Sequence, residues 1–189
     1  DKYYFRDITW VGNTKYDTTV LNRVLGINKG DVYNKELLQN NLQYQEGGYD
    51  VSSLYMDDGY LFFQVDPVEL RVENDSIDLE IRLYEGDQAT IGQVTVTGNT
   101  KTNDYVAVRE LYTKPGQLFS RSDIIRTTRE LAALGYFNAE TLNPDIQPDP
   151  TDGTVDIEYV VEETSSDQIE LSAGWGYNKL ILTLGLTLN

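Results

Sequence analysis

The carboxylates near residue 150 are the side chains best placed to bind an ion. Asp145, Asp149 and Asp152 precede Gly153, but their spacing does not match an EF-hand calcium loop. A solvated hairpin loop explains them better. Gly174-Trp175-Gly176 lacks the third glycine and the following helix of a dinucleotide site. Neither segment predicts a ligand site.

The sequence contains no histidine and no cysteine in 189 residues. This excludes Ser-His-Asp triads, thiolate chemistry, disulfides and classical zinc sites within the chain. No nucleophile lies in a pattern that pairs it with a base. We therefore expect neither catalysis nor a cofactor.

The charge is strongly acidic, with 31 Asp and Glu against 15 Lys and Arg and a net charge of −16. Phosphate backbones and anionic lipid surfaces repel such a chain, so nucleic acid is not an expected partner. A basic or uncharged polypeptide partner remains open, as does a role in solubility alone. The first residues, 1–5, lack the organisation of a signal peptide, which favours a mature or internal start.

One segment order occurs twice in the chain. Gly12-Asn13-Thr14-Lys15 recurs as Gly98-Asn99-Thr100-Lys101, and Gly59-Tyr60-Leu61 corresponds to Gly135-Tyr136-Phe137. The first copy carries extra residues at about 44–51. Each copy predicts the order β-α-α-β-β.

Alternation and capping define these elements. Apolar residues at 77, 79, 81 and 83 alternate with charged ones, and 155–161 repeat the pattern, which predicts half-buried closing strands. Ser120 is a good N-cap, and Phe119 with Ile124 occupies the positions of a hydrophobic staple. Turns are expected at 73–75 and 151–153. Each copy is thus a two-layer α+β module.

The last 25 residues, 165–189, change character. Apolar residues alternate with small and polar ones in two runs of about ten residues, the length of a tilted transmembrane β-strand. Asn178-Lys179 is a candidate turn between the runs. A soluble hairpin that covers another sheet is the alternative, and the pattern alone does not decide between the two.

The motifs together resemble a known family. The second copy contains Val108-Arg109-Glu110-Leu111, Gly116-Gln117-Leu118-Phe119-Ser120, Leu134-Gly135-Tyr136-Phe137 and Val155-Asp156-Ile157-Glu158-Tyr159, and leads into Gly174-Trp175-Gly176-Tyr177. That order is similar to the last POTRA domain and first barrel strand of BamA-like outer-membrane protein assembly factors.

The resemblance implies an α+β fold of two tandem βααββ POTRA modules, each a three-stranded sheet covered by two helices. Residues 1–87 would be the fourth module of five, residues 88–164 the fifth, and residues 165–189 the first hairpin of a transmembrane β-barrel. The resemblance also implies the outer membrane of a Gram-negative bacterium, with the modules in the periplasm and lipid around the barrel.

The implied partners are unfolded outer-membrane proteins and accessory lipoproteins. Clients would add a strand to exposed sheet edges by β-augmentation. The expected client-binding edges are Tyr60, Leu61, Phe62, Phe63, Gln64 and Val65, ending at Asp66-Pro67, and Tyr136, Phe137 and Asn138. Core packing is the alternative role for these aromatic residues. The expected seam strand of the barrel contains Ile169, Leu171, Ala173, Trp175 and Tyr177.

Arg109 and Glu110 are the expected contact for an accessory lipoprotein. The family often has two arginines before this glutamate, whereas position 108 is Val here. Two other roles are compatible with POTRA modules: export of one dedicated partner through a barrel, and a scaffold that binds partners without inserting proteins.

Overall fold

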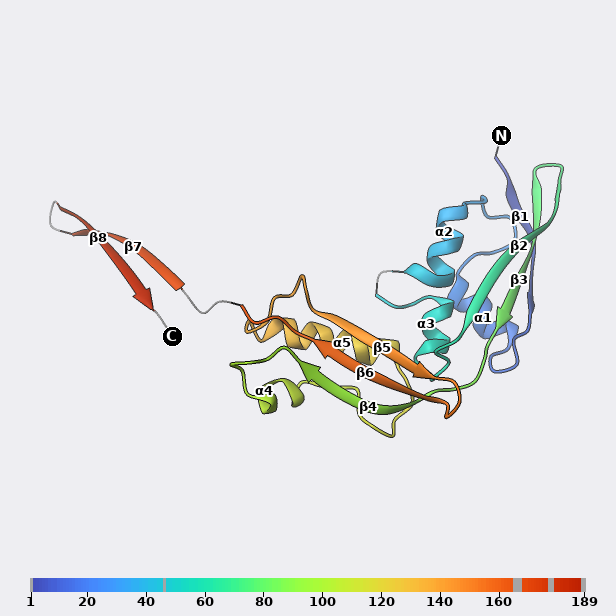
Figure 1. The fold of residues 1–189 in the computed structure, drawn as a ribbon. Coiled ribbons are helices and arrows are strands. Elements are labelled where there is room, and N and C mark those ends of the chain that lie inside the picture. The colour runs from blue at the N-terminus through green and yellow to red at the C-terminus, as the bar shows by residue number, and fades with distance from the viewer. Residues whose placement is uncertain (1, 46, 165–167, 177–178, 188–189) are drawn as a thin grey trace.

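The computed structural model describes residues 2–45, 47–164, 168–176 and 179–187 (Figure 1). The first module contains β1 (Tyr4–Val11), α1 (Thr18–Leu25), α2 (Lys35–Gln39), the π-helical η1 (Asn40–Tyr44), α3 (Val51–Met56), β2 (Gln64–Glu73) and β3 (Ser76–Tyr84). The second contains β4 (Thr90–Thr97), α4 (Asp104–Val108), α5 (Arg121–Ala133), β5 (Asn143–Asp149) and β6 (Thr154–Val160).

Each module has one three-stranded sheet with its last strand in the middle. The strand orders are β1-β3-β2 and β4-β6-β5. The central strand pairs parallel with the first strand and antiparallel with the second. The two sheets and their helices (Figure 1) confirm the α+β part of the predicted fold.

The central strands carry the two cores. Ile77, Leu79 and Ile81 of β3 are at most 3% exposed, and the matching residues of β6, 155, 157 and 159, are at most 1% exposed. The predicted alternation is therefore confirmed. Burial of each such side chain contributes about 1.5–3 kcal/mol.

The capping signals are confirmed at α5. The Ser120 hydroxyl accepts a hydrogen bond from the Asp123 backbone N–H at 3.2 Å. Phe119 and Ile124 are both buried. Gly135, which follows the C-cap Leu134, has φ of 74° and ends the helix.

The first module has one more helical break than the sequence predicts. Its second helix is divided into α2 with η1, and then α3, because the extra residues at 44–51 lie between them. Asp50 restarts the helix: its buried carboxylate accepts from the Ser53 N–H at 2.8 Å and from the Ser53 hydroxyl at 3.1 Å.

The C-terminal residues form an antiparallel hairpin of β7 (Gln168–Gly176) and β8 (Lys179–Thr187). The expected seam positions 169, 171, 173 and 175 lie on β7, whereas Tyr177 lies outside the described residues. That this hairpin opens a barrel stays a prediction. Within the described ranges, no helix combines the length and apolar character needed to cross a membrane.

The recurring Gly-Asn-Thr-Lys segment forms the turn after β1 and the turn after β4. In both modules this turn lies very close to the backbone of the central strand. Gly12 and Gly98 have φ of 91° and 94°. A Cβ on Gly12 would overlap the carbonyl oxygen of Leu83, and one on Gly98 would overlap that of Val161. Glycine is therefore needed at both positions, because the backbone of the turn packs directly against the backbone of the central strand.

We expect Gly98→Ala to lower the unfolding free energy much more than Gly116→Ala. Both glycines have positive φ, at 94° and 84°, so both variants carry backbone strain of about 1–2 kcal/mol. Gly116 faces open space, whereas Gly98 faces Val161, so Gly98→Ala adds about 1–3 kcal/mol of overpacking. Urea unfolding measures both, and equal losses would contradict the close approach.

Candidate functional site

The first predicted client edge is displaced in the structure. β2 begins at Gln64, so Tyr60, Leu61, Phe62 and Phe63 precede the strand, and only Gln64 and Val65 lie on it. Phe63 is 5% exposed and its ring stacks on Tyr55 with centroids 4.2 Å apart. The prediction of an edge strand at 60–63 was wrong, because these residues precede β2, and Phe63 is buried in the core with Tyr60 packed against it.

The second predicted edge is also misplaced. β5 begins at Asn143, and Phe137 is 2% exposed. The backbone around it is already paired: the Asn138 N–H donates to the Glu162 carbonyl at 2.8 Å, and the Thr164 N–H donates to the Tyr136 carbonyl at 2.9 Å. Tyr136, Phe137 and Asn138 therefore hold the exit segment of the module and form no free edge.

Prolines limit the edges formed by β2 and β5. Pro67 lies inside β2 and does not end it, and Pro144 and Pro148 lie inside β5. An edge strand tolerates proline where the missing N–H would point outward. The Gln43 side-chain amide already donates to the outward carbonyl of Val65 at 3.0 Å. An added strand therefore finds few free backbone groups along β5 and at the start of β2.

The opposite edges, β1 and β4, are half covered and half open. The Phe5 N–H donates to the Asp31 carbonyl at 2.9 Å, and the Ile91 N–H donates to the Gln117 carbonyl at 2.7 Å, so loops cover the first half of each strand. The second halves, residues 8–11 and 94–97, contain no proline. On the β2 edge, residues 68–73 after Pro67 also contain no proline.

The register of β4 fixes which backbone groups are free. The Thr97 carbonyl accepts from the Val161 N–H at 2.8 Å, so Thr97 points toward the centre of the sheet. Because N–H and C=O of one residue point to the same side in a parallel pair, Val94 and Val96 present theirs outward. The sequence analysis missed these edges because strand order cannot be read from the pattern of single strands.

A carboxylate joins the two modules. Asp57, which follows α3, accepts from the Ser122 N–H at 2.7 Å and from the Ser122 hydroxyl at 2.5 Å. It thereby caps the first turn of α5, where the helix dipole favours negative charge. Desolvation, with the Asp57 charge as a second cause, raises the pKa of Asp123 on the same turn.

Backbone and apolar contacts complete this joint. The Ala89 N–H donates to the Gly59 carbonyl at 2.8 Å, and the Gln88 side chain donates to the Asp58 carbonyl at 2.7 Å. Met56 and Leu61 of the first module pack against the core of the second. The segment 85–89 that connects the modules is therefore hydrogen-bonded to the first module at Gln88 and Ala89.

Equivalent glutamates hold the exit of each module. Glu85 accepts from the Thr14 and Lys15 N–H groups at 2.8 and 2.9 Å, and Glu163 accepts from the Lys101 and Thr102 N–H groups. Desolvation by itself would raise the pKa of Glu163, but the hydrogen bonds from Thr102, Thr100 and Lys101 outweigh it and lower the pKa to about 2. The motif thus binds the segment by which the chain leaves its own module.

The expected lipoprotein contact lies at the end of α4. Arg109 Nε donates to Glu110 Oε1 at 2.8 Å, so the two side chains pair with each other. The neighbouring Tyr105 and Val108 are 69% and 53% exposed. This combination of an ion pair and exposed apolar side chains is compatible with a protein contact, which stays a prediction. Among the described residues, no group of three or more acidic side chains could hold a metal ion.

A two-layer module with its last strand at the centre of a three-stranded sheet thus occurs twice in tandem. The family model for POTRA, described as "Surface antigen variable number repeat", matches residues 3–86 and 89–164. The chain belongs to the POTRA family.

Curated proteins with similar sequences include outer membrane protein assembly factors. BamA of Neisseria meningitidis, an outer membrane protein assembly factor, is 28% identical over 134 residues, or 68% of this chain and 16% of that protein. A Treponema pallidum relative, provisionally named an outer membrane protein assembly factor, is 26% identical over 171 residues, 90% of this chain and 20% of its own. The chain spans 16–20% of the curated relatives it matches.

Solved structures agree on the fold. Haemophilus ducreyi BamA lacking POTRA domains 1–3 superposes with a TM-score of 0.76 at 23% identity, covering 93% of this chain and 32% of that one. Haemophilus influenzae BamA POTRA3–5 gives 0.71 at 20% identity, covering 85% and 61%.

We expect Glu163→Gln to weaken the pH dependence of stability. The pKa of Glu163 is about 2 in the folded chain against an ordinary value of 4.5. Its stabilising contribution is therefore complete above the ordinary value and is lost as the pH falls toward 2. Urea unfolding between pH 6 and 2.5 should show a steeper loss for the wild type than for the variant. Glu162→Gln, an exposed neighbour, is the control, and matching slopes for wild type and Glu163→Gln would refute the assignment.

We expect Asp57→Ala to loosen the joint between the modules. Loss of the cap on α5 costs about 1 kcal/mol, so the modules sample a wider range of orientations. The chain has no cysteine, so spin labels attach only at the introduced Thr19→Cys in the first module and Glu140→Cys in the second. Pulsed electron paramagnetic resonance then gives the distribution of distances between the two labels. Asp66→Ala on β2 should leave the distribution unchanged. A distribution that Asp57→Ala does not broaden would mean that the apolar contacts alone fix the joint.

Proposed function

We propose that the chain is the periplasmic part of an outer-membrane protein assembly factor. It receives unfolded β-barrel clients by strand addition and passes them to a barrel that begins with β7 and β8. The observation that carries this proposal is the open second half of β4, with the matching half of β1. The similarity to curated assembly factors supports it.

Strand addition suits a receptor for many clients. Outward N–H and C=O groups at Val94 and Val96 pair with any backbone, whatever its side chains. The exposed residues between and after them, Thr95 and Thr97, have β-branched side chains that favour extended partners. The β2 edge at Gln64 and Val65 is a secondary site, since Gln43 occupies one of its carbonyls.

The hairpin of β7 and β8 supplies the second step, in which the client passes from the modules to the barrel. Its antiparallel register runs from Gln168 opposite Thr187 to Gly176 opposite Lys179. At a barrel seam, unpaired backbone groups within lipid are costly, so a client strand that pairs with β7 is stabilised. Accessory lipoproteins would contact Arg109, Glu110 and the exposed side chains beside them.

A photo-crosslinking amino acid at Thr95 tests the proposal in the full-length protein within its own cell. We expect capture of several unrelated outer-membrane proteins at Thr95, at least several-fold more than at the exposed control position Glu140, because Glu140 lies between α5 and β5 and on no sheet edge. Mass spectrometry identifies the captured proteins.

Each other outcome has a definite meaning. Capture of one secreted partner alone would identify a dedicated exporter. Capture of other periplasmic proteins without barrel clients would favour a scaffold. Equal capture at Thr95 and Glu140 would contradict strand addition at β4.

A further inference from the structure

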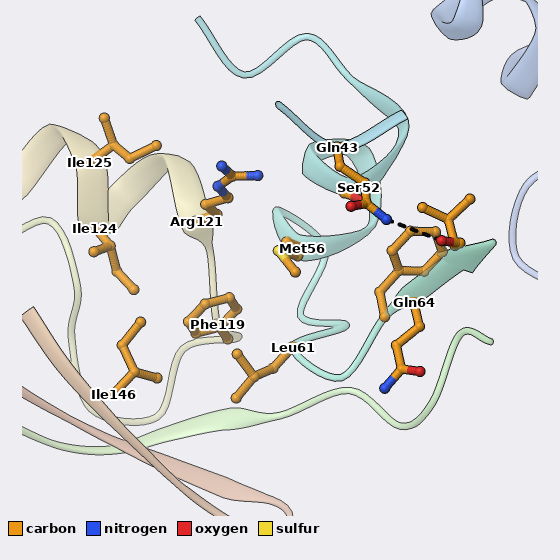
Figure 2. A pocket seen from close by; sticks show the side chains of 12 residues that line it. Gln43, Ser52, Met56, Leu61, Gln64, Phe119, Arg121, Ile124, Ile125 and Ile146 are labelled. Carbon is orange, nitrogen blue, oxygen red and sulfur yellow. Dashed lines mark hydrogen bonds between the residues drawn. The ribbon is translucent and has the colours of Figure 1, made fainter. Parts of the chain in front are cut away.

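A groove lies between the two modules, with a volume of about 710 Å³ (Figure 2). One wall comes from Met56, Leu61 and the start of β2, and the other from α5 and β5. Ile125 on the second wall is 44% exposed. A volume in the range of roughly 300–1,000 Å³ is that of ligand pockets, and the joint described above holds both walls in place.

The charge of this groove is opposite to that of the protein. Acidic residues outnumber basic ones by 31 to 15 in the chain, yet the groove lining contains Arg121 and no acidic side chain among the described residues. Figure 2 shows Arg121 on α5 beside the apolar side chains. Among the described residues, Arg121 is linked to a carboxylate through the Ser53 hydroxyl, which accepts from Arg121 and donates to Asp50 at 3.1 Å.

Arg121 has donors to spare. One Nη1 contact reaches the Ser53 hydroxyl at 3.4 Å, and none of the ion pairs found in the described ranges involves Arg121. A guanidinium carries five N–H donors in a planar fork that matches a carboxylate. An apolar surrounding strengthens such a pair relative to water.

The backbone at the groove permits only a short pairing. Ile146 lines the groove on β5 and lies two residues from each of Pro144 and Pro148. Residues two apart on a strand point their N–H groups to the same side, so Ile146 offers the single outward N–H between two prolines. Binding here depends on side chains more than on the backbone.

We propose that this groove binds a short extended client segment that carries a carboxylate beside apolar side chains. The apolar side chains contact Ile125, Ile146 and Met56, and the carboxylate pairs with Arg121. This inference rests on the proposed function and adds sequence preference to it: the open edges accept any strand, whereas the groove selects for an acidic group. The carboxylate is either a side chain or the C-terminus of the client.

Three five-residue peptides with alternating leucine and phenylalanine test the groove on the purified chain. One ends in an amidated aspartate, one in an amidated asparagine, and one in a leucine with a free carboxyl. Fluorescence anisotropy should give at least about tenfold tighter binding for one or both carboxylate peptides than for the asparagine peptide. Which of the two binds identifies the source of the carboxylate.

Variants then assign the site. Arg121→Gln should remove the preference and Arg121→Lys should retain part of it, whereas Arg129→Gln, an exposed residue further along α5, should change nothing. Ile125→Ser should weaken all three peptides. Equal binding of the carboxylate and asparagine peptides, or an unchanged preference in Arg121→Gln, would overturn the proposal. Neither result would affect crosslinking at Thr95, so failure of the groove and failure of the assembly role are separable.

Discussion

The contact on which each module depends is the approach of one turn, β1–α1 in the first module and β4–α4 in the second, to the end of the central strand. At Gly12 and Gly98 this approach is so close that no side chain fits. Glu85 and Glu163 then bind the N–H groups of the same turns. Because the chain leaves each module at these glutamates, the direction of exit is set by the same contact that closes the core.

The joint extends this arrangement from one module to the next. Asp57 caps a helix of the second module, and Gly59 accepts from the linker backbone at Ala89. Both residues follow α3, the helix that the insertion in the first module separates from α2. The insertion in the first module thus places the residues that join the two modules. The groove between the modules exists because this joint holds both of its walls.

The sequence predicted those features that depend on local patterns. The alternation at 77–83 and the cap at Ser120 are local and were correct. The client edges were misplaced because aromatic runs at 60–63 and 136–137 resemble edge strands, whereas Phe63 and Phe137 are core residues. Strand order and the contact of Asp57 with Ser122, which are 65 residues apart, depend on tertiary structure, and no local signal reveals them.

The prolines of β2 and β5 have a consequence for how much backbone an edge can pair. A sheet with two open edges could stack with other sheets indefinitely, as fibrils do. Here Pro144 and Pro148 interrupt the β5 edge, and Pro67 interrupts the β2 edge near its start. Each proline shortens the run of backbone with which another strand can pair. A long client therefore pairs over short stretches, and most of it stays unpaired and able to move onward.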